Sequence, residues 1–399
     1  MKEKIVNLIA NHVEGMTAEE IATFIEIPPK QELGDYAFPC FRLAKTMHKA
    51  PNLIAADIKE AIGDIDFLDK IDVQGAYLNF FVKKNIFVQT MIESALKDNF
   101  GGSDEGADKV ICIDYSSPNV AKNFHVGHLR TTIIGNSLYK IYSKLGYKVI
   151  RINHLGDWGT QFGKLIVAYK NWGTKEAVEK DGVAELMRLY VKFHEEADQN
   201  PELVDEARAW FSKMEHGDEE ALSIWQWFKD ISLVEYKRTY DLLGMDFDYY
   251  LGESFYRDKC QEVVDQLTNA NLLKESEGAM IVDLSDYDMA PCIVTKKDGS
   301  SIYATRDLAA IFYRKNTYHF TKCLYVTGQE QKLHFAQVFK VVELLGNDWA
   351  KDSLVHIPYG LVSLEGAKLS TRSGNIIYAE DILHDAIKKS FEIISEKSP

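Results

Sequence analysis

The spacing of apolar positions predicts a small mixed domain at the start of the chain. Apolar residues recur at helical spacing over residues 5–13, and the apolar run AYLNFFV over residues 76–82 has the composition of a strand. Residues 99–108 (NFGGSDEGAD) are rich in glycine and acidic residues, as linkers are. These patterns predict an N-terminal α+β domain covering residues 1–108.

Beyond residue 108, apolar runs alternate with stretches of helical periodicity. Strands separated by one helix each pair in parallel, so we expect a Rossmann-like α/β fold with a doubly wound parallel sheet over residues 109–375. The predicted strands cover residues 110–115, 148–153, 323–326 and 354–359, and the predicted helices between them cover residues 126–145 and 332–345.

One long stretch, at about residues 165–290, interrupts this alternation. It carries three helical patterns and much of the negative charge, which indicates a helical insertion between two halves of the sheet. The helical patterns cover residues 184–197, 201–214 and 220–243, and a further one covers residues 380–394 after the sheet.

Composition narrows the class of protein. The chain of 399 residues has 46 Lys+Arg and 60 Asp+Glu, a net charge of −14, with 46% hydrophobic residues. These values are ordinary for a soluble globular protein, and no apolar stretch predicts a membrane span. The acidic total taken alone argues against non-specific nucleic-acid binding. The five cysteines form no C-x-x-C pair, so we expect no zinc site and a reducing compartment.

The first motif with chemical content follows the strand at residues 110–115. In SSPNVAKNFHVGHLRT (residues 116–131), His125 and His128 fall in the first turn of the predicted helix, where they face one side and where backbone N–H groups favour anions. Gly127 leaves room for a flat ring such as adenine. Two donors at a helix start suit the charge of a phosphoryl group in transit. The alternative is a helix start with two surface histidines.

The second motif is GAKLSTRSGN, at residues 366–375. Lys368, Ser370, Thr371 and Arg372 between glycines describe a cationic, hydroxyl-bearing loop that could close over a polyphosphate. Taken alone, such a segment is better explained as a surface turn.

Together the two motifs resemble the HIGH and KMSKS signatures of class I aminoacyl-tRNA synthetases. The surrounding residues resemble the arginyl-tRNA synthetase family. The matching stretches are SSPNVAKNFHVGHLRTTIIGN, NHLGDWGTQFGKL, SIYATRDLAA, TGQEQKLHFAQ and KLSTRSGN. The stretch GDYAFPCFRLAK (residues 34–45) is similar to the family's additional N-terminal domain, which contacts the tRNA elbow. On this resemblance, residues 376–399 begin a helical anticodon-binding domain of which most is missing.

The resemblance implies a two-stage reaction. L-arginine attacks MgATP to give arginyl-adenylate, and the arginyl group then passes to the 2′-hydroxyl of the terminal adenosine of tRNA(Arg). ATP with Mg²⁺ is a substrate, and neither zinc nor a tightly bound organic cofactor is expected. The family generally needs bound tRNA for the first stage. We expect a cytoplasmic monomer that has no membrane partner.

The resemblance also assigns roles to residues. One departure is Thr371, which replaces the second lysine of KMSKS; either Lys122 or Arg372 could compensate. For arginine itself a carboxylate is needed, and Asp114 and Asp307 are candidates, Asp307 alternatively being a helix N-cap. The expected catalytic residues are Lys122, His125, His128 and Lys368; the expected ATP contacts are Gly127, His128, Lys368, Ser370 and Arg372; the expected arginine contacts are Asp114, Asn119, His125, Tyr303, Asp307 and Gln331.

Alternatives to an arginyl enzyme remain open at this point. They are another nucleotidyltransferase with an HxGH motif, a glutamyl or cysteinyl synthetase, and a non-catalytic or impaired tRNA-binding fragment or paralogue. The acidic net charge does not decide against RNA, because the excess lies substantially in the insertion and the linker, while cations gather near the motifs.

Overall fold

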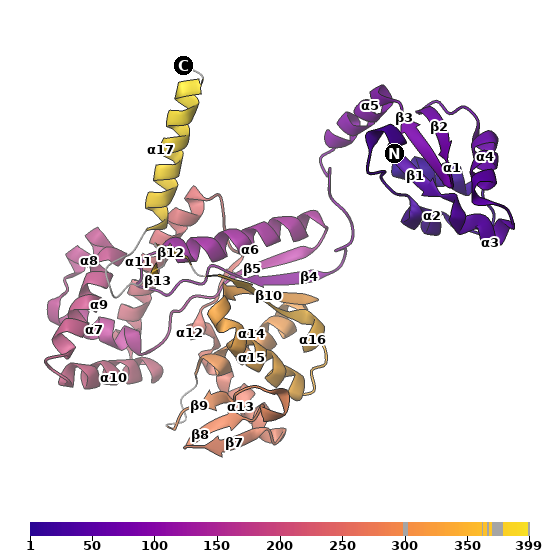
Figure 1. The fold of residues 1–399 in the computed structure, drawn as a ribbon. Helices are drawn as coiled ribbons and strands as arrows, with labels where there is room; N and C mark the ends of the chain where they lie inside the picture. The colour runs from indigo at the N-terminus through magenta and orange to yellow at the C-terminus, as the bar shows by residue number, and fades with distance from the viewer. Residues whose placement is uncertain (298–301, 361, 365–366, 369–377, 398–399) are drawn as a thin grey trace. The chain divides into compact units, whose positions relative to one another are not determined.

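The chain folds into two compact units, Met1–Gly101 and Gly102–Pro399, in a computed structural model (Figure 1). The structure describes residues 1–297, 302–360, 362–364, 367–368 and 378–397, with backbone only at 363–364 and 367–368. In this part of the chain, none of the helices combines the length and apolar character needed to cross a membrane.

The first unit is a three-stranded antiparallel sheet with helices packed on it. The strand order is β1-β3-β2, and Phe80 in the central strand is fully buried with Ile5 and Ile54 from two of the helices. The helix predicted at residues 5–13 is present but begins and ends earlier, and the predicted strand is present. The elements are α1 (Lys2–Ala10), α2 (Ala18–Phe24), β1 (Tyr36–Pro39), α3 (Ala44–Met47), α4 (Pro51–Ile62), β2 (Leu68–Gln74), β3 (Tyr77–Val82) and α5 (Lys84–Ala95).

Part of the glycine-rich acidic stretch is bound to the second unit. The N–H groups of Ser103 and Gly106 donate to the carbonyls of Lys144 (3.2 Å) and Leu145 (2.8 Å). A Cβ at Gly106 would lie 2.3 Å from a ring carbon of Tyr147, so this close approach requires glycine. The stretch is therefore anchored at its second half rather than flexible throughout.

The second unit is built on a five-stranded parallel sheet, which confirms the predicted fold class. Its order is β11-β10-β4-β5-β6, with every pair parallel. Strands β5 and β6 extend the sheet on one side of β4, whereas β10 and β11 extend it on the other side, so the strand order reverses between β10 and β4. Open α/β sheets bind ligands at the carboxyl ends of their strands at such a reversal. The strands are β4 (Val110–Asp114), β5 (Lys148–Asn153), β6 (Tyr249–Tyr250), β10 (Lys322–Gly328) and β11 (Leu354–Tyr359).

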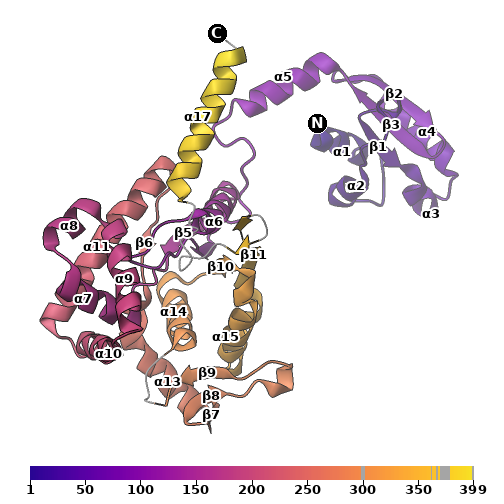
Figure 2. The ribbon, with the colours of Figure 1, turned by 60° about the vertical axis from the view of Figure 1, so that its left-hand side comes forward.

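Helices cover both faces of this sheet, which explains the continuous apolar run in β4. Ile111 and Ile113 pack with residues of α6 and α11, whereas Cys112 packs with residues of α14 and α15 on the other face. Figures 1 and 2 show α6 on one side and α14 and α15 on the other. All five cysteines lie in the described part of the chain, are buried in the core and form no disulfide. The covering helices are α6 (Val126–Lys144), α14 (Tyr303–Tyr318) and α15 (Lys332–Leu344), with the short α16 (Ala350–Ser353).

The insertion contains the predicted helices and, in addition, strands that periodicity did not predict. Strands β7, β8 and β9 form a three-stranded antiparallel sheet. Glu277 and Gly278 both have positive φ (51° and 80°), which is the geometry of a two-residue hairpin between β7 and β8. The elements are α7 (Thr160–Trp172), α8 (Lys175–Asp181), α9 (Val183–Ala197), α10 (Glu202–Glu215), α11 (Glu219–Leu242), α12 (Glu253–Tyr256), α13 (Cys260–Asn269), β7 (Leu273–Ser276), β8 (Ala279–Val282) and β9 (Cys292–Thr295).

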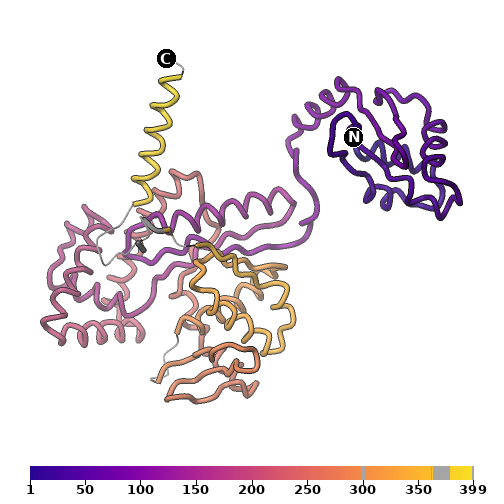
Figure 3. Tube along the Cα trace, in the orientation of Figure 1, coloured from indigo at the N-terminus to yellow at the C-terminus, as the bar shows by residue number. Residues whose placement is uncertain are grey.

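The last described elements follow the sheet. A short hairpin, β12 (Ser363–Leu364) and β13 (Ala367–Lys368), precedes the segment 369–377, and α17 (Ala379–Lys397) confirms the helix predicted at residues 380–394. Figure 3 traces α17, in yellow, from its start beside the segment that leads into α6.

Candidate active site

A pocket of about 420 Å³ opens at the carboxyl ends of β4 and β10, where the strand order reverses. Its wall is formed by residues that are far apart in the sequence, from the turn after β4 to the helices α14 and α15. The sequence-predicted residues that line it are Asp114, Asn119, His128, Tyr303, Asp307 and Gln331.

The two histidines of the HxGH motif cap helix α6. The helix begins at Val126, and Nδ1 of His125 accepts the backbone N–H of Gly127 at 3.0 Å. In return, Nδ1 of His128 accepts the backbone N–H of His125 at 3.3 Å. The two rings stack with centroids 3.8 Å apart. Since Nδ1 is the acceptor in each ring, the proton of each neutral imidazole is assigned to Nε2.

Burial keeps both imidazoles neutral. The pKa of His128 lies well below its ordinary value because the ring is buried and because His125 and Lys122 add positive charge nearby. The pKa of His125 is lowered by burial and by Lys122. At neutral pH the motif therefore presents two neutral Nε2–H donors at the positive end of a helix.

The histidine pair makes a testable prediction about pH. As pH falls, kcat should stay constant through the range around 6.5, where an ordinary histidine titrates, and should drop only below it. Protonation of Nδ1 would remove the acceptors that cap α6.

The same pKa values predict how stability depends on pH. Because both pKa values are lower in the folded chain, the unfolded chain takes up protons first as pH falls. The contribution of the pair to stability is therefore complete above pH 6.5 and declines as pH falls below it.

Ring-proton NMR titration of the two histidines would measure these pKa values directly. Variants His125→Gln and His128→Gln would assign the two signals. A midpoint at or above 6.5 for both rings would contradict the prediction.

The structure shows a role for Gly127 within the protein itself, whereas the sequence suggested only a role in ligand binding. A Cβ on this residue would lie 2.8 Å from Cε1 of His125. The missing side chain therefore leaves room for the histidine that caps the helix. Whether the same gap also receives adenine stays a prediction.

Asp114, the first carboxylate candidate, is paired within the protein. Ser117 Oγ donates to its Oδ1 at 2.8 Å, and Nη2 of Arg314 lies 2.8 Å from its Oδ2. Arg314 is fully buried and also lies 3.1 Å from Nδ1 of His154. The charge of Asp114 is thus balanced by an internal arginine, which distinguishes it from a carboxylate reserved for a ligand guanidinium.

Asp307, the second candidate, is not a helix N-cap, so that alternative is wrong. Helix α14 begins at Tyr303 with Ile302 as N-cap, which places Asp307 in its second turn. There, Oδ2 of Asp307 lies 2.6 Å from Nε2 of His334 on α15. The pairing orients the carboxylate from one side.

Sequence reasoning missed a third pocket carboxylate, Glu253. Nη1 of Arg306 donates to its Oε2 at 2.7 Å. Burial raises the pKa of Glu253 to about 7, with Arg306 opposing the shift and Asp307 adding to it. Glu253 follows the two-residue strand β6, which was not predicted, so the sequence gave no reason to place it at the sheet edge.

Asn119 is fixed by the loop after β5. It forms an isolated parallel bridge with Gly156, and a Cβ on Gly156 would lie 2.1 Å from Oδ1 of Asn119. Tyr303, the first residue of α14, is 62% exposed, so its ring is accessible to a ligand in the pocket. Gln331 ends the short 3₁₀ turn before α15.

The cationic residues of the second motif cannot be placed. Ser370 and Arg372 lie outside the described residues, and Lys368 is described only as backbone in β13. Lys122 lies close enough to both histidines to lower their pKa values. The choice between Lys122 and Arg372 as the compensating cation stays a prediction.

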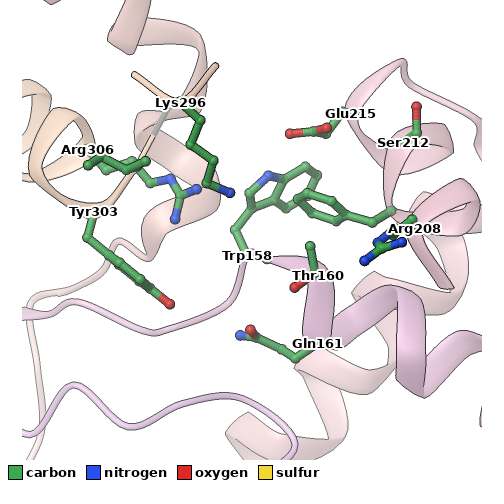
Figure 4. Close-up of a pocket in the computed structure, with 12 residues that line it drawn as sticks. Trp158, Thr160, Gln161, Arg208, Ser212, Glu215, Lys296, Tyr303 and Arg306 are labelled. Carbon is green, nitrogen blue, oxygen red and sulfur yellow. The ribbon is translucent and has the colours of Figure 1, made fainter. Parts of the chain in front are cut away.

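A second pocket, of about 500 Å³, adjoins the first and shares Tyr303 and Arg306 with it. Figure 4 shows Trp158 between these two residues and the side chains of α10. Trp158 is 3% exposed and packs edge-on against Phe211, so it forms a wall of this pocket.

Comparison with known families now adds to this geometry. Residues 2–82 match the model of the arginyl tRNA synthetase N terminal domain, and residues 91–399 match the model of class I (R) tRNA synthetases, catalytic domain. An arginine–tRNA ligase from Alkaliphilus metalliredigens is 56% identical over 400 residues, covering 100% of this chain and 70% of the relative. One from Clostridioides difficile gives the same values.

Solved structures show the same fold. The arginyl-tRNA synthetase of Thermus thermophilus has a TM-score of 0.70 at 21% identity, covering 100% of this chain and 71% of that chain. The enzyme of Plasmodium falciparum has a TM-score of 0.62 at 22% identity, covering 100% and 70%. The catalytic-domain match and the 56% identity place the chain within the arginyl branch rather than with the glutamyl, cysteinyl or other HxGH alternatives. The chain belongs to the arginyl-tRNA synthetase family of class I aminoacyl-tRNA synthetases.

Proposed function

We propose that the 420 Å³ pocket is where L-arginine reacts with MgATP, before the arginyl group passes to tRNA(Arg). The observation that carries this assignment is the stacked, neutral histidine pair at the start of α6, beside a pocket that holds carboxylates on two other helices. Groups that can donate hydrogen bonds to phosphate oxygens thus lie beside carboxylates that can bind a cation.

The phosphate half of the reaction needs donors rather than a general base. A carboxylate oxygen of arginine attacks the α-phosphorus, a new P–O bond forms, and the bond to the β-phosphate breaks to release pyrophosphate. His125 and His128 donate from Nε2 to the oxygens on which charge builds up, and Lys122 and Lys368 balance the departing phosphates. Ser370, Arg372 and the backbone at Gly127 complete the ATP contacts in this proposal.

The arginine half is read by charge. Asp307, which lies against His334, provides the carboxylate that faces the guanidinium. Glu253 lies close enough to add to the negative charge there, but it is already paired with Arg306. Asp114, whose charge Arg314 already balances, serves with Asn119 and Gln331 at the amino-acid backbone. Tyr303 covers the ligand from the exposed side.

The remaining assignments follow the family. In the described part of the chain, no three His, Cys, Asp or Glu side chains gather as a metal site, and Mg²⁺ enters with ATP as substrate. We propose that the chain works in the cytoplasm as a monomer and that the N-terminal region 1–108 contacts the tRNA. The final residues, 376–399, start the anticodon-binding region in this proposal.

Asp307→Asn tests the proposed function. The asparagine can still accept from His334, but it loses the charge that faces the guanidinium, so KM for arginine should rise about 10- to 100-fold. The measurement is arginine-dependent ATP–pyrophosphate exchange with tRNA(Arg) present, and with citrulline, whose side chain is neutral, as the competing amino acid.

The matched control is Asp265→Asn, an exposed aspartate on α13 that bonds Gln261. It should leave KM for arginine unchanged. A KM for arginine within twofold of the unmodified chain in Asp307→Asn would remove Asp307 from the arginine pocket.

A further inference from the structure

The segment between β4 and α6 is backbone-strained and must be held in place. Ser116, Ser117 and Ala121 have positive φ values of 70°, 46° and 60° although none is glycine. A residue other than glycine adopts such a φ value at a cost in free energy, and it does so only where the surroundings impose it. The segment leads directly into His125, so whatever holds it also sets the position of the histidine pair.

Helix α11 holds the first part of this segment. The hydroxyl of Tyr236 bonds the carbonyls of Asn119 (2.6 Å) and Lys122 (2.7 Å), and Ser232 Oγ accepts the N–H of Ala121 at 2.9 Å. Ser232 and Tyr236 are both fully buried and lie one turn apart. One face of α11 therefore holds the backbone of residues 119–122 in place through hydrogen bonds.

The start of α17 holds the second part. Tyr378 forms an antiparallel bridge with His125, and the N–H of Ala379 donates to the carbonyl of Phe124 at 3.1 Å. Asn123 Nδ2 also donates to the hydroxyl of Tyr378 at 3.3 Å. Figure 3 shows this meeting of chain segments that are about 250 residues apart in the sequence.

One ion pair joins the two holders to each other. Arg238 on α11 donates to both oxygens of Glu380 on α17, from Nε at 2.9 Å and from Nη2 at 2.6 Å. Thr239 Oγ1 donates to the same carboxylate at 3.0 Å. Bidentate pairs fix orientation as well as distance, so the pair sets the angle at which α17 meets the segment.

We propose that Arg238 and Glu380 are positioning residues that clamp α17 onto α11 and thereby hold the strained segment and the cap of α6. Neither residue contacts the pocket. Their effect reaches the reaction through the backbone of residues 123–125. The clamp rests on the proposed role of His125 only where kcat is the measurement.

The test uses Glu380→Gln and Arg238→Met in the full chain. Backbone amides of residues 124–129 should exchange hydrogen for deuterium at least threefold faster in each variant. In arginine-dependent ATP–pyrophosphate exchange with tRNA(Arg) present, kcat should fall about three- to tenfold, while KM for arginine changes less than twofold. Arg238→Lys keeps the positive charge but loses the bidentate geometry. Its hydrogen-exchange rates and its kcat should lie between those of Arg238→Met and of the unmodified chain.

The control is Lys274→Met, which breaks a comparably exposed pair with Asp283 on the β7–β8 hairpin. It should change neither the exchange at residues 124–129 nor kcat. Unaltered hydrogen exchange at these amides in both clamp variants would overturn the proposal, as would an equal acceleration in the control. If the unmodified chain shows no arginine-dependent turnover, the proposed function fails, but hydrogen exchange still decides the clamp.

Discussion

Replacing His128 with alanine is expected to reduce kcat for arginine-dependent ATP–pyrophosphate exchange by about 10²- to 10³-fold, the usual effect of removing one preorganised donor from a transition state. The ring is half-buried at the pocket wall and neutral, and Nδ1 is occupied by the N–H of His125, so Nε2 is the position left to donate. KM for ATP should change only a few-fold, because the interaction strengthens as charge builds up on the phosphoryl group.

Two variants separate this role from simple packing. His128→Gln can place an amide nitrogen near the position of Nε2 and should retain more activity than the alanine variant. His12→Ala, at an exposed histidine that follows α1 and whose Nδ1 lies 2.8 Å from the carbonyl oxygen of Leu8, should behave as the unmodified chain. A kcat within twofold of normal in His128→Ala would remove the residue from the chemistry.

The histidine pair could be predicted from the sequence because all its determinants are local. A strand, a turn and a helix start follow one another within residues 110–128, and a spacing of three residues across the N-cap and first turn of a helix favours two rings on one side. The reciprocal capping by Nδ1 could not be predicted, since it depends on the ring orientations. It is nevertheless the feature that decides which nitrogen of each ring carries the proton.

The carboxylates of the pocket show where sequence reasoning stops. Asp114 and Asp307 look equivalent in the sequence, but Arg314 neutralises one of them from a position 200 residues away. Glu253 was missed because β6 has only two residues, too few for any periodicity. Burial and pairing across long separations set these differences, and local pattern carries no information about either.

The largest stability effect is expected at the buried ion pair between Asp157 and Lys229. Asp157 is fully buried; it pairs with Lys229 Nζ at 2.6 Å and accepts from the N–H and Oγ of Ser254 at 2.8 and 2.7 Å. Gly252 must be glycine there, because a Cβ would lie 2.4 Å from the carboxylate. The pair therefore connects α11, the loop after β5 and the turn that carries Glu253.

Lys229→Met should lower the free energy of unfolding of the second unit by about 3–5 kcal/mol, because it leaves the buried charge of Asp157 uncompensated. Urea denaturation followed by tryptophan fluorescence measures this unit alone, since all 6 tryptophans lie at or beyond residue 158.

Two further variants test the cause of the destabilisation. The double variant Asp157→Asn, Lys229→Met removes the uncompensated charge and should recover at least half of the lost free energy of unfolding. Lys175→Met, which breaks an exposed pair with Glu179, should cost less than about 1 kcal/mol. If Lys229→Met costs no more than Lys175→Met, the pair does not hold this part of the fold together, and the position of Glu253 must be set by backbone contacts such as its N–H to the carbonyl of Leu155 at 3.0 Å.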